Sequence, residues 1–185
     1  MHITDDIKYK AIMKTFDCVV VGGGMVGAAS ALSLAQLGLT VAIVEQKIPM
    51  KYSPEQSFDF RVSAISLASE HLLTQLGAWR QIEAWRHCPY QRLGVWEHEF
   101  SYTEFNAQDI GRSHLGHIIE NRLLQLSLWQ EIEQHPNVAL YAPETLLEIN
   151  QKIEHVELSL SQNKISTKLL IAADGANSKV RELVG

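Results

Sequence analysis

The stretch FDCVVVGGGMVGAASALSLAQLG, residues 16–38, contains the pattern that decides the fold. Its first six residues are mostly apolar and rich in valine, which is typical of a buried parallel strand. After the glycines, residues 25–37 carry small and apolar side chains suited to a helix, and Gly38 stands where such a helix would end. Residues 39–45, LTVAIVE, predict a second buried strand. Strand, glycine turn, helix and strand together form one βαβ unit.

Three glycines with G-x-G-x-x-G spacing, Gly22, Gly24 and Gly27, each have a physical role in such a turn. The first allows the tight turn, the second lets a pyrophosphate approach the backbone, and the third lets helix and strand pack closely. The phosphates then meet free N–H groups at the start of the helix, where Met25 and Val26 stand. The spacing also occurs in plain tight turns, but the flanking strand and helix favour a nucleotide site.

An acidic residue, Glu45, ends the second predicted strand. A carboxylate at this place accepts hydrogen bonds from both hydroxyls of an adenosine ribose and disfavours a 2′-phosphate. The alternative is a solvated carboxylate at a strand end, because glutamate is normally exposed. The fingerprint fits NAD and FAD equally well.

Beyond the βαβ unit the pattern becomes mixed, starting with a polar surface loop over residues 47–58. We expect a strand at 59–65, helices at 66–76 and 78–85, two hairpin strands within 91–105, a third strand at 116–119, a helix at 121–134, and strands at 138–141, 146–150, 153–160 and 164–172. A second strand–turn–helix signal, LLIAADGANSKVREL, follows. The expected antiparallel strands disfavour a simple NAD(P)-dependent dehydrogenase, whose sequence would continue with βα repeats.

The composition is that of an ordinary soluble globular protein, with 46% hydrophobic and 20% charged residues. A net charge of -5 argues against a nucleic-acid partner. Two cysteines are too few for a disulfide framework and favour a reducing, cytoplasmic setting. Residues 1–15 lack the apolar segment of a secretory signal. No apolar stretch approaches the ~20 residues of a membrane span, so we expect any membrane contact to be peripheral.

The sequence predicts neither a metal site nor a nucleophile. His114 and His117 are spaced like a ligand pair, but no cysteine or carboxylate cluster accompanies them at zinc or iron spacing. No G-x-S-x-G turn occurs, and Cys18 lies in a predicted buried strand. The tryptophans, Trp79, Trp85, Trp96 and Trp129, are expected to pack mostly in the core.

Residues 16–185 resemble the flavoprotein aromatic hydroxylases, particularly the branch that hydroxylates the ring in ubiquinone biosynthesis. The resemblance is carried by residues 16–38, FDFRVSAIS (58–66), GHIIENRLLQLSLW (116–129) and LLIAADGANSKVRELVG (169–185). Within that branch, HCPYQRLGVWEHE (87–99) is most similar to hydroxylases of 2-polyprenyl-3-methyl-6-methoxy-1,4-benzoquinol. The resemblance implies an α/β fold: a Rossmann-like FAD-binding domain of the glutathione-reductase-like type, with part of an antiparallel-sheet substrate domain.

The resemblance also implies a domain organisation. Residues 16–90 form the FAD-binding βαβ region, 91–119 part of the substrate-domain sheet, and 120–185 a return to the FAD-binding domain, with 1–15 as an N-terminal extension. Family members are far longer and carry a third flavin motif, G-D-A-x-H, that this sequence does not contain. We therefore expect a truncated, N-terminal half that alone binds FAD weakly or not at all and does not hydroxylate.

Further site residues are implied by the resemblance. Arg61 matches the family arginine that reaches the FAD diphosphate and the nicotinamide path, and Arg122 matches the one beside the ribityl chain. Without the resemblance, both would be read as surface arginines. Asp174 and Gly175 match a motif near the pyrophosphate. Asp174 also stands where it would cap a helix, and the two roles are compatible.

The activity implied is that NAD(P)H reduces FAD and one atom of O2 is transferred to a polyprenylated quinol or phenol. The protein then positions the reactants and excludes water, and no side chain is assigned as the chemical catalyst. Such an apolar substrate favours peripheral contact with the inner face of the membrane, or membership of a ubiquinone-biosynthesis complex or homo-oligomer. The alternative is a catalytically inactive nucleotide-binding or assembly module.

Overall fold

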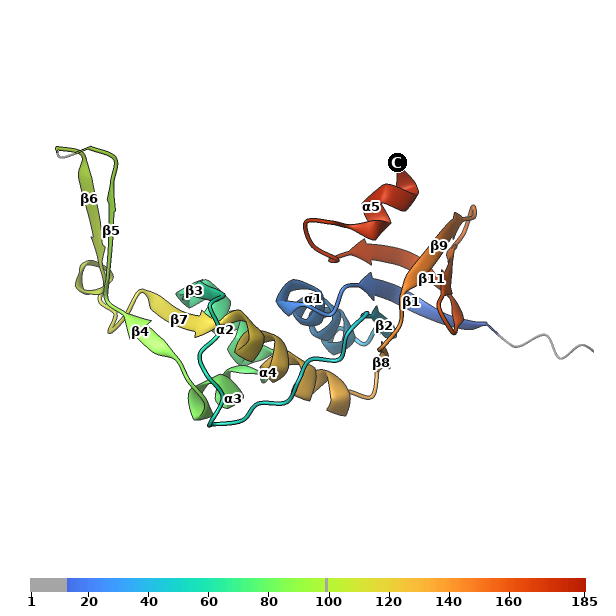
Figure 1. Cartoon of the computed structure of the whole chain (residues 1–185), viewed down its shortest axis with the longest axis horizontal. Coiled ribbons are helices and arrows are strands. Elements are labelled where there is room, and N and C mark those ends of the chain that lie inside the picture. Colours follow the sequence, from blue (N-terminus) through green and yellow to red (C-terminus); the bar gives the residue numbers. More distant parts are fainter. Residues whose placement is uncertain (1–12, 99) are drawn as a thin grey trace, which may run out of the picture.

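The computed structural model describes residues 13–98 and 100–185 of the chain. A curved six-stranded sheet lies at one end of an elongated molecule, helices occupy the middle, and a hairpin projects at the other end (Figure 1). The mixed α/β architecture agrees with the fold class predicted from the sequence.

The six-stranded sheet has the order β8-β2-β1-β11-β10-β9. Its strands are β1 (Lys14–Val21), β2 (Val41–Val44), β8 (Val138–Tyr141), β9 (Leu146–Gln151), β10 (Val156–Leu160) and β11 (Lys164–Ala172). The first four strands in this order run parallel to one another. β10 then pairs antiparallel with β11, and β9 pairs antiparallel with β10. β1 therefore lies inside the sheet, and its carboxyl end is flanked by those of β2 and β11.

Both faces of β1 are buried, which is why its sequence is a nearly continuous apolar run. Cys18 and Val20 belong to one core cluster, which also contains residues of the helices. Val19 and Val21 belong to a second cluster on the opposite face, with residues of β9, β10 and β11. The alternation follows from the two-residue period of a strand.

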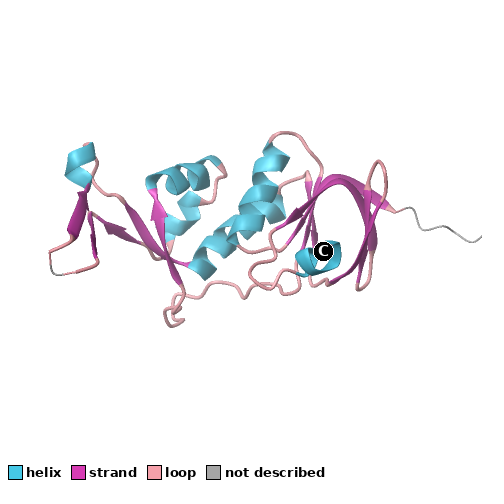
Figure 2. Cartoon of the chain, turned by 90° about the horizontal axis from the view of Figure 1, so that it is seen from above, coloured by secondary structure: helices cyan, strands magenta, loops and turns pink. Residues whose placement is uncertain are grey.

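The helices are α1 (Met25–Gln36), α2 (Leu67–Gln75), α3 (Trp79–Ala84), α4 (Asn121–Gln134), α5 (Lys179–Val184) and the short 3-10 turn η1 (Ala107–Ile110). α1 and α4 pack together on the helix-covered face of the sheet, whereas α5 lies on the inner side of its curve (Figure 2). α1 begins directly after Gly24, and Gly38 beyond its end has a φ of 87°, as the glycine pattern predicts.

A second, three-stranded sheet has the order β3-β7-β4, and β5 and β6 form a separate hairpin. The bounds are β3 (Val62–Ser66), β4 (Cys88–Tyr90), β5 (Arg92–Trp96), β6 (Tyr102–Asn106) and β7 (Gly116–Glu120). The strand expected at 116–119 exists, but it pairs with β3 and β4 and not with the hairpin. β4 is not predicted from the sequence, because three residues are too few to show a periodicity. The division of the chain at residue 90 stays a prediction.

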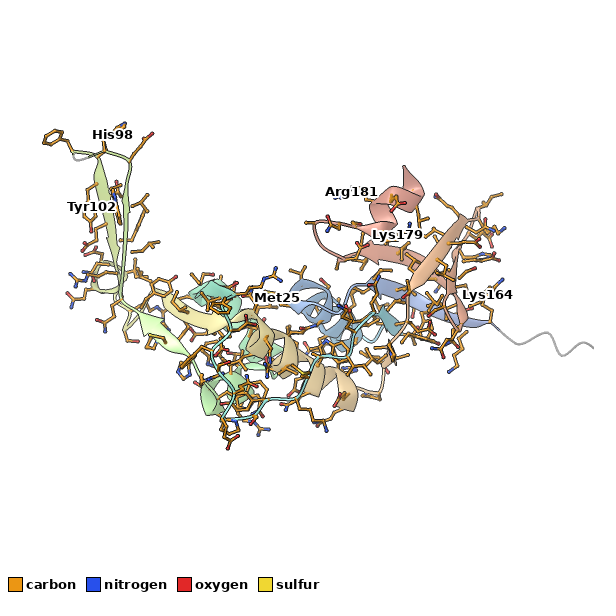
Figure 3. The ribbon with its side chains drawn as sticks, in the orientation of Figure 1. Met25, His98, Tyr102, Lys164, Lys179 and Arg181 are labelled. Carbon is orange, nitrogen blue, oxygen red and sulfur yellow. The ribbon has the colours of Figure 1, made fainter. Side chains whose placement is uncertain are left out.

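One tryptophan contradicts its expected place in the core. Trp79 and Trp129 are buried, but Trp96 on β5 is 70% exposed. Figure 3 shows His98 and Tyr102 on the same projecting hairpin, far from Lys179 and Arg181. The prediction for Trp96 is wrong because, among the described residues, the two-stranded hairpin has no second layer packed on it.

The glycine turn fixes how closely α1 approaches the sheet. Gly22 has a φ of 105°, and a Cβ there would lie 2.3 Å from the carbonyl oxygen of Ala173. A Cβ on Gly27 would lie 1.9 Å from the carbonyl oxygen of Gly22. A Cβ on Gly24 would meet no described atom within 4 Å. The first and third glycines are therefore required by packing, and the second is not.

We predict that Gly27→Ala lowers the free energy of unfolding by about 3 kcal/mol, because the added methyl overlaps rigid backbone. The matched control, Gly24→Ala, has open space at its Cβ and loses no more than about 1 kcal/mol through the weaker N-cap. Urea unfolding followed by circular dichroism measures both. Equal losses in the two variants would contradict this account of the turn.

Candidate functional site

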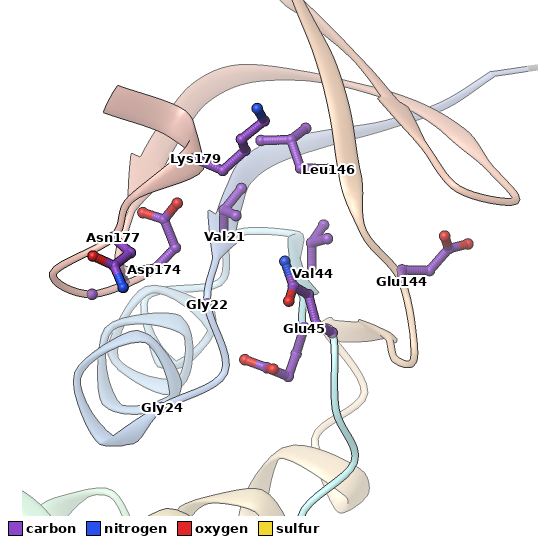
Figure 4. Close-up of a pocket in the computed structure, with 13 residues that line it drawn as sticks. Val21, Gly22, Gly24, Val44, Glu45, Glu144, Leu146, Asp174, Asn177 and Lys179 are labelled. Carbon is purple, nitrogen blue, oxygen red and sulfur yellow. The ribbon is translucent and has the colours of Figure 1, made fainter. Parts of the chain in front are cut away.

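A pocket of about 420 Å³ opens at the carboxyl ends of β1, β2 and β11 (Figure 4). Its lining residues are Val21, Gly22, Gly24, Val44, Glu45, Gln46, Glu144, Leu146, Ala173, Asp174, Gly175, Asn177 and Lys179. The structure therefore brings Gly22, Gly24, Glu45, Asp174 and Gly175 together from distant parts of the sequence. Ligands of open parallel sheets bind at this edge.

The start of α1 faces this pocket without a side-chain cap. Gly24 is the N-cap residue, no side chain among the described residues caps the helix there, and the first turn contains no acidic residue. The N–H groups and the positive end of the helix dipole are therefore available to an anion. Met25 and Val26 line a separate apolar groove with residues of α2 and α4, and neither is in the lining of the pocket.

Glu45 is held in place by two backbone N–H groups. Its Oε2 accepts a hydrogen bond from the Gly23 N–H at 2.6 Å, and its Oε1 accepts one from the Lys47 N–H at 3.0 Å. A carboxylate oxygen has more than one acceptor site, so each oxygen keeps capacity for a ligand hydroxyl. The carboxylate joins the end of β2 to the glycine turn and stands in the pocket lining (Figure 4).

Helix α4 holds the same turn from the other side. The carbonyl oxygen of Gly23 accepts hydrogen bonds from Nε1 of Trp129 at 2.7 Å and from Nε2 of Gln125 at 2.8 Å. The sequence analysis assigned Trp129 to the core, which is correct, but missed this contact. The four-residue spacing of Gln125 and Trp129 places them on one helix face, yet it does not name their partner.

Asp174 accepts hydrogen bonds with both carboxylate oxygens. Oδ1 accepts from the Ser178 hydroxyl at 2.6 Å, and Oδ2 accepts from the Val180 N–H at 3.0 Å. Burial acts to raise the pKa of Asp174, but the hydrogen bonds from Ser178 and the backbone outweigh it and hold the pKa below its ordinary value. Ser178 is the N-cap residue of α5, and Asp174 supports that cap from the preceding turn. The expectation that Asp174 is the N-cap residue is therefore wrong, because Ser178 holds that position, but Asp174 still accepts a hydrogen bond from an N–H of the first turn of α5.

The pocket contains a third carboxylate, Glu144, which is buried and was not predicted from the sequence. It accepts hydrogen bonds from the Ser161 hydroxyl, the Asn163 side chain and the Gln162 N–H, the last at 3.0 Å. Burial acts to raise the pKa of Glu144, but these donors hold it below its ordinary value. Glu144 follows β8, the parallel neighbour of β2, so its place at this edge was in principle predictable from the strand order.

Arg61 and Arg122 lie outside the pocket lining and form a second group. The carbonyl of Arg61 accepts a hydrogen bond from the Asn121 N–H at 2.9 Å, which brings the two arginines to the same junction. The Arg61 side chain is exposed. The Arg122 guanidinium donates to the carbonyl of Lys51 at 3.4 Å and to the side chain of Gln56, so it holds the loop that follows β2.

The histidine pair has a carboxylate neighbour that the sequence spacing does not reveal. Oε2 of Glu70 lies 3.0 Å from Nε2 of His114 and 3.1 Å from Nδ1 of His117. Burial, reinforced by the neighbouring histidines and opposed by Glu70, lowers the pKa of His117. Glu70 is far from the pair along the chain and reaches it because α2 directly follows β3, the strand that pairs with β7.

Within the two described ranges, 13–98 and 100–185, no helix is both long and apolar enough to span a bilayer.

A glycine turn, an uncapped helix start and a carboxylate at the carboxyl edge of a parallel sheet define the class of α/β domains that bind an adenine dinucleotide. Residues 15–185 match the family described as "FAD binding domain", and the chain belongs to that family.

Curated relatives act in ubiquinone biosynthesis. Over 170 residues the chain is 43% identical to the 3-demethoxyubiquinol 3-hydroxylase of Escherichia coli, covering 91% of this chain and 44% of that protein. Over 195 residues it is 32% identical to the mitochondrial ubiquinone biosynthesis monooxygenase COQ6 of Danio rerio, covering 92% and 38%. The chain thus spans less than half the length of these relatives.

Solved structures share the fold. The p-nitrophenol 4-monooxygenase PnpA from Pseudomonas putida is 22% identical with a TM-score of 0.73, covering 94% of this chain and 44% of that one. The flavin-dependent monooxygenase PieE, in complex with FAD and substrate, is 18% identical with a TM-score of 0.71, covering 92% and 32%. At these identities the likeness supports the fold alone.

For Asp174→Asn we predict a loss of about 2 kcal/mol in the free energy of unfolding at neutral pH, because hydrogen bonds to a charged acceptor are lost. The depressed pKa stabilises the fold above the unfolded-state value, and this contribution disappears as the pH falls below about 4. The difference between wild type and variant should therefore shrink in acid.

The exposed Asp109 provides the control variant, Asp109→Asn, for which we expect little change. Urea unfolding at a series of pH values measures both variants. If the difference in free energy of unfolding between wild type and Asp174→Asn stays constant from neutral to acidic pH, the charge of the Asp174 carboxylate does not stabilise the fold.

Proposed function

We propose that this chain is the FAD-binding, N-terminal part of an FAD-dependent, NAD(P)H-using monooxygenase that hydroxylates a polyprenylated quinol or phenol ring in ubiquinone biosynthesis. The observation that carries the proposal is the pocket at the end of β1, where the uncapped start of α1 and the Glu45 carboxylate lie together. The 43% identity to a 3-demethoxyubiquinol 3-hydroxylase supports the choice of substrate class.

The residues of the pocket fit the adenosine diphosphate part of FAD. The N–H groups of Met25 and Val26 would receive the diphosphate, and the open space at Gly24 lets it approach the backbone. Glu45 would accept hydrogen bonds from the ribose hydroxyls. Val44 and Leu146 supply an apolar wall beside it.

The flavin, when bound, supplies the electron transfer from NAD(P)H and the activation of O2. The residues of this chain bind and orient it. Gln125 and Trp129 fix the Gly23 carbonyl within the glycine turn, and Asp174 fixes the turn before α5, so both turns would be held in shape to receive the cofactor. Arg61 and Arg122 would add positive charge along the diphosphate and ribityl chain, where guanidinium groups suit phosphate oxygens.

The partners in this proposal are O2 and a polyprenylated quinol met at the inner face of the membrane or in a ubiquinone-biosynthesis complex. The β5–β6 hairpin supports an apolar contact, because Leu93, Val95, Trp96, Tyr102 and Phe105 are large and exposed. A second copy of the chain would cover the same surface in a homo-oligomer.

We predict that Gly24→Ala mainly weakens FAD binding, whereas Gly27→Ala mainly lowers the stability of the fold. Joining this chain to the C-terminal part of the Escherichia coli relative gives a chimera of the relative's full length. We expect it to purify with bound flavin, and we expect Gly24→Ala to weaken FAD binding about tenfold or more while the fold is kept, because its methyl enters the space needed by the diphosphate.

Flavin absorbance, FAD titration and 18O2 incorporation into a demethoxyubiquinol analogue measure the outcome. Glu45→Ala should weaken FAD binding, and the exposed Glu148→Ala should leave it unchanged. A folded but colourless chimera would instead favour the nucleotide-binding or assembly module. Bound flavin without labelled product would contradict the substrate class and leave the FAD site standing.

A further inference from the structure

We propose that Glu70, His114 and His117 form a binding site for a divalent transition-metal ion, with Zn²⁺ the best match to the donor set. The three side chains offer one carboxylate oxygen and two imidazole nitrogens, and these atoms all lie within 4.8 Å of one another. Oε2 of Glu70 is closest to both nitrogens, at 3.0 Å from His114 and 3.1 Å from His117. Two histidines and one glutamate are a ligand set that zinc uses.

The spacing suits one ion between the three atoms. Zinc binds imidazole nitrogen at about 2.0–2.1 Å and carboxylate oxygen at about 2.0–2.2 Å in tetrahedral geometry, so neighbouring ligand atoms lie about 3.4 Å apart. The two contacts of Glu70 are within a few tenths of an ångström of that separation. Small side-chain rotations, without backbone movement, would admit the ion.

The second observation concerns His117, whose Nδ1 points into this cluster. The side chain is only 7% exposed. Nδ1 lies 3.1 Å from Oε2 of Glu70, yet it makes no hydrogen bond of acceptable geometry with any group in residues 13–98 and 100–185. A buried polar atom without a partner costs about 1–3 kcal/mol. A metal ion would give this nitrogen a ligand bond.

The surroundings hold both imidazoles in orientations suited to a metal ligand. Nδ1 of His114 lies 2.9 Å from the Ser113 hydroxyl, so that the ring can donate there and keep the Nε2 lone pair toward Glu70. The His117 ring packs edge-on against Trp79, with centroids 5.0 Å apart.

The ion would join three segments: the first turn of α2, the segment before β7, and β7 itself. A surface hollow lined by Pro89, Gln91, Arg92, Ser113 and His114 adjoins the cluster and provides a route from solvent. The exposed His87 ring lies 5.2 Å from that of His117, so either His87 or a water molecule is suited to the fourth position. The site is separate from the pocket at β1 and does not depend on FAD.

The alternative is a hydrogen-bonded His–Glu–His network that needs no metal, and metal titration of the 185-residue chain distinguishes the two. We expect CoCl2 to bind with one equivalent and give the intense visible absorption of tetrahedral cobalt. ZnCl2 should then displace the cobalt and raise the melting temperature, because it binds the folded state. Chelator-treated protein without added metal is the reference.

The decisive variants are Glu70→Gln and His114→Ala, and His117→Ala is a third if it folds. Each removes a metal ligand and should weaken cobalt and zinc binding about 100-fold or more, beyond the roughly 10–100-fold loss typical of outer-shell changes that leave the ligands in place. The matched control is His155→Ala, because His155 and Glu157 form a partly exposed pair at 3.4 Å outside the cluster. We expect its metal binding to equal wild type.

Two outcomes would overturn the proposal. One is the absence of stoichiometric binding of cobalt or zinc at micromolar concentration by folded wild-type chain. The other is binding that survives in both Glu70→Gln and His114→Ala, or that is lost in His155→Ala.

Discussion

The contact between Gly27 and the carbonyl oxygen of Gly22 is the constraint on which the rest of the site depends. At that contact the backbone of α1 reaches the end of β1 with no room for a methyl group. Gly22 makes a similarly close approach to Ala173 at the end of β11. Three backbone segments therefore converge on one turn, and any side chain there would push the start of α1 away from the edge where the pocket opens.

The peptide of Gly23 is then fixed from two directions. Its N–H donates to Glu45, and its carbonyl accepts from Gln125 and Trp129. Helix α4 thus closes the turn, and α4 follows β7 directly in the chain. In the sequence α4 looks like an ordinary core helix, but it also determines the shape of the pocket. The ring of Trp129 is buried in the core, while its indole N–H donates a hydrogen bond to the glycine turn.

Much of this fold follows from local sequence, and the part that does not has a common physical cause. The βαβ unit, α4 and the strand ending before Asp174 were all predicted, because glycine punctuation and hydrophobic periodicity are properties of neighbouring residues. Periodicity shows that a face is buried but not what buries it. The partners of β7, the contact of Trp129 with Gly23 and the approach of Glu70 to His117 are all long-range, and no spacing along the chain encodes them.

The same limit explains the error at Trp96 and the gaps in the predicted pocket. Leu93 and Val95 lie on one face of β5 and Trp96 on the other, and all three are exposed, because no layer of described residues covers either face of the hairpin. Glu144 was missed because the turn after β8 has no motif, although the parallel strand order brings it to the same edge as Glu45. Knowledge of strand order, more than of motifs, would have completed the pocket.

The charges of the pocket constrain how it would hold a dinucleotide. Glu45, Glu144 and Asp174 all line it, and hydrogen bonds keep the pKa values of Glu144 and Asp174 low, so both are ionised at neutral pH. Lys179, the cation in the lining, is paired with Glu182 at 2.9 Å. A diphosphate at this edge would therefore depend on the dipole and N–H groups of α1. The arginines at the junction of β3 and α4 lie outside the lining, where they are free of these carboxylates. In the proposed function, the start of α1 would receive the diphosphate beside the acid that recognises the ribose, and Arg61 and Arg122 would add positive charge only from outside this lining.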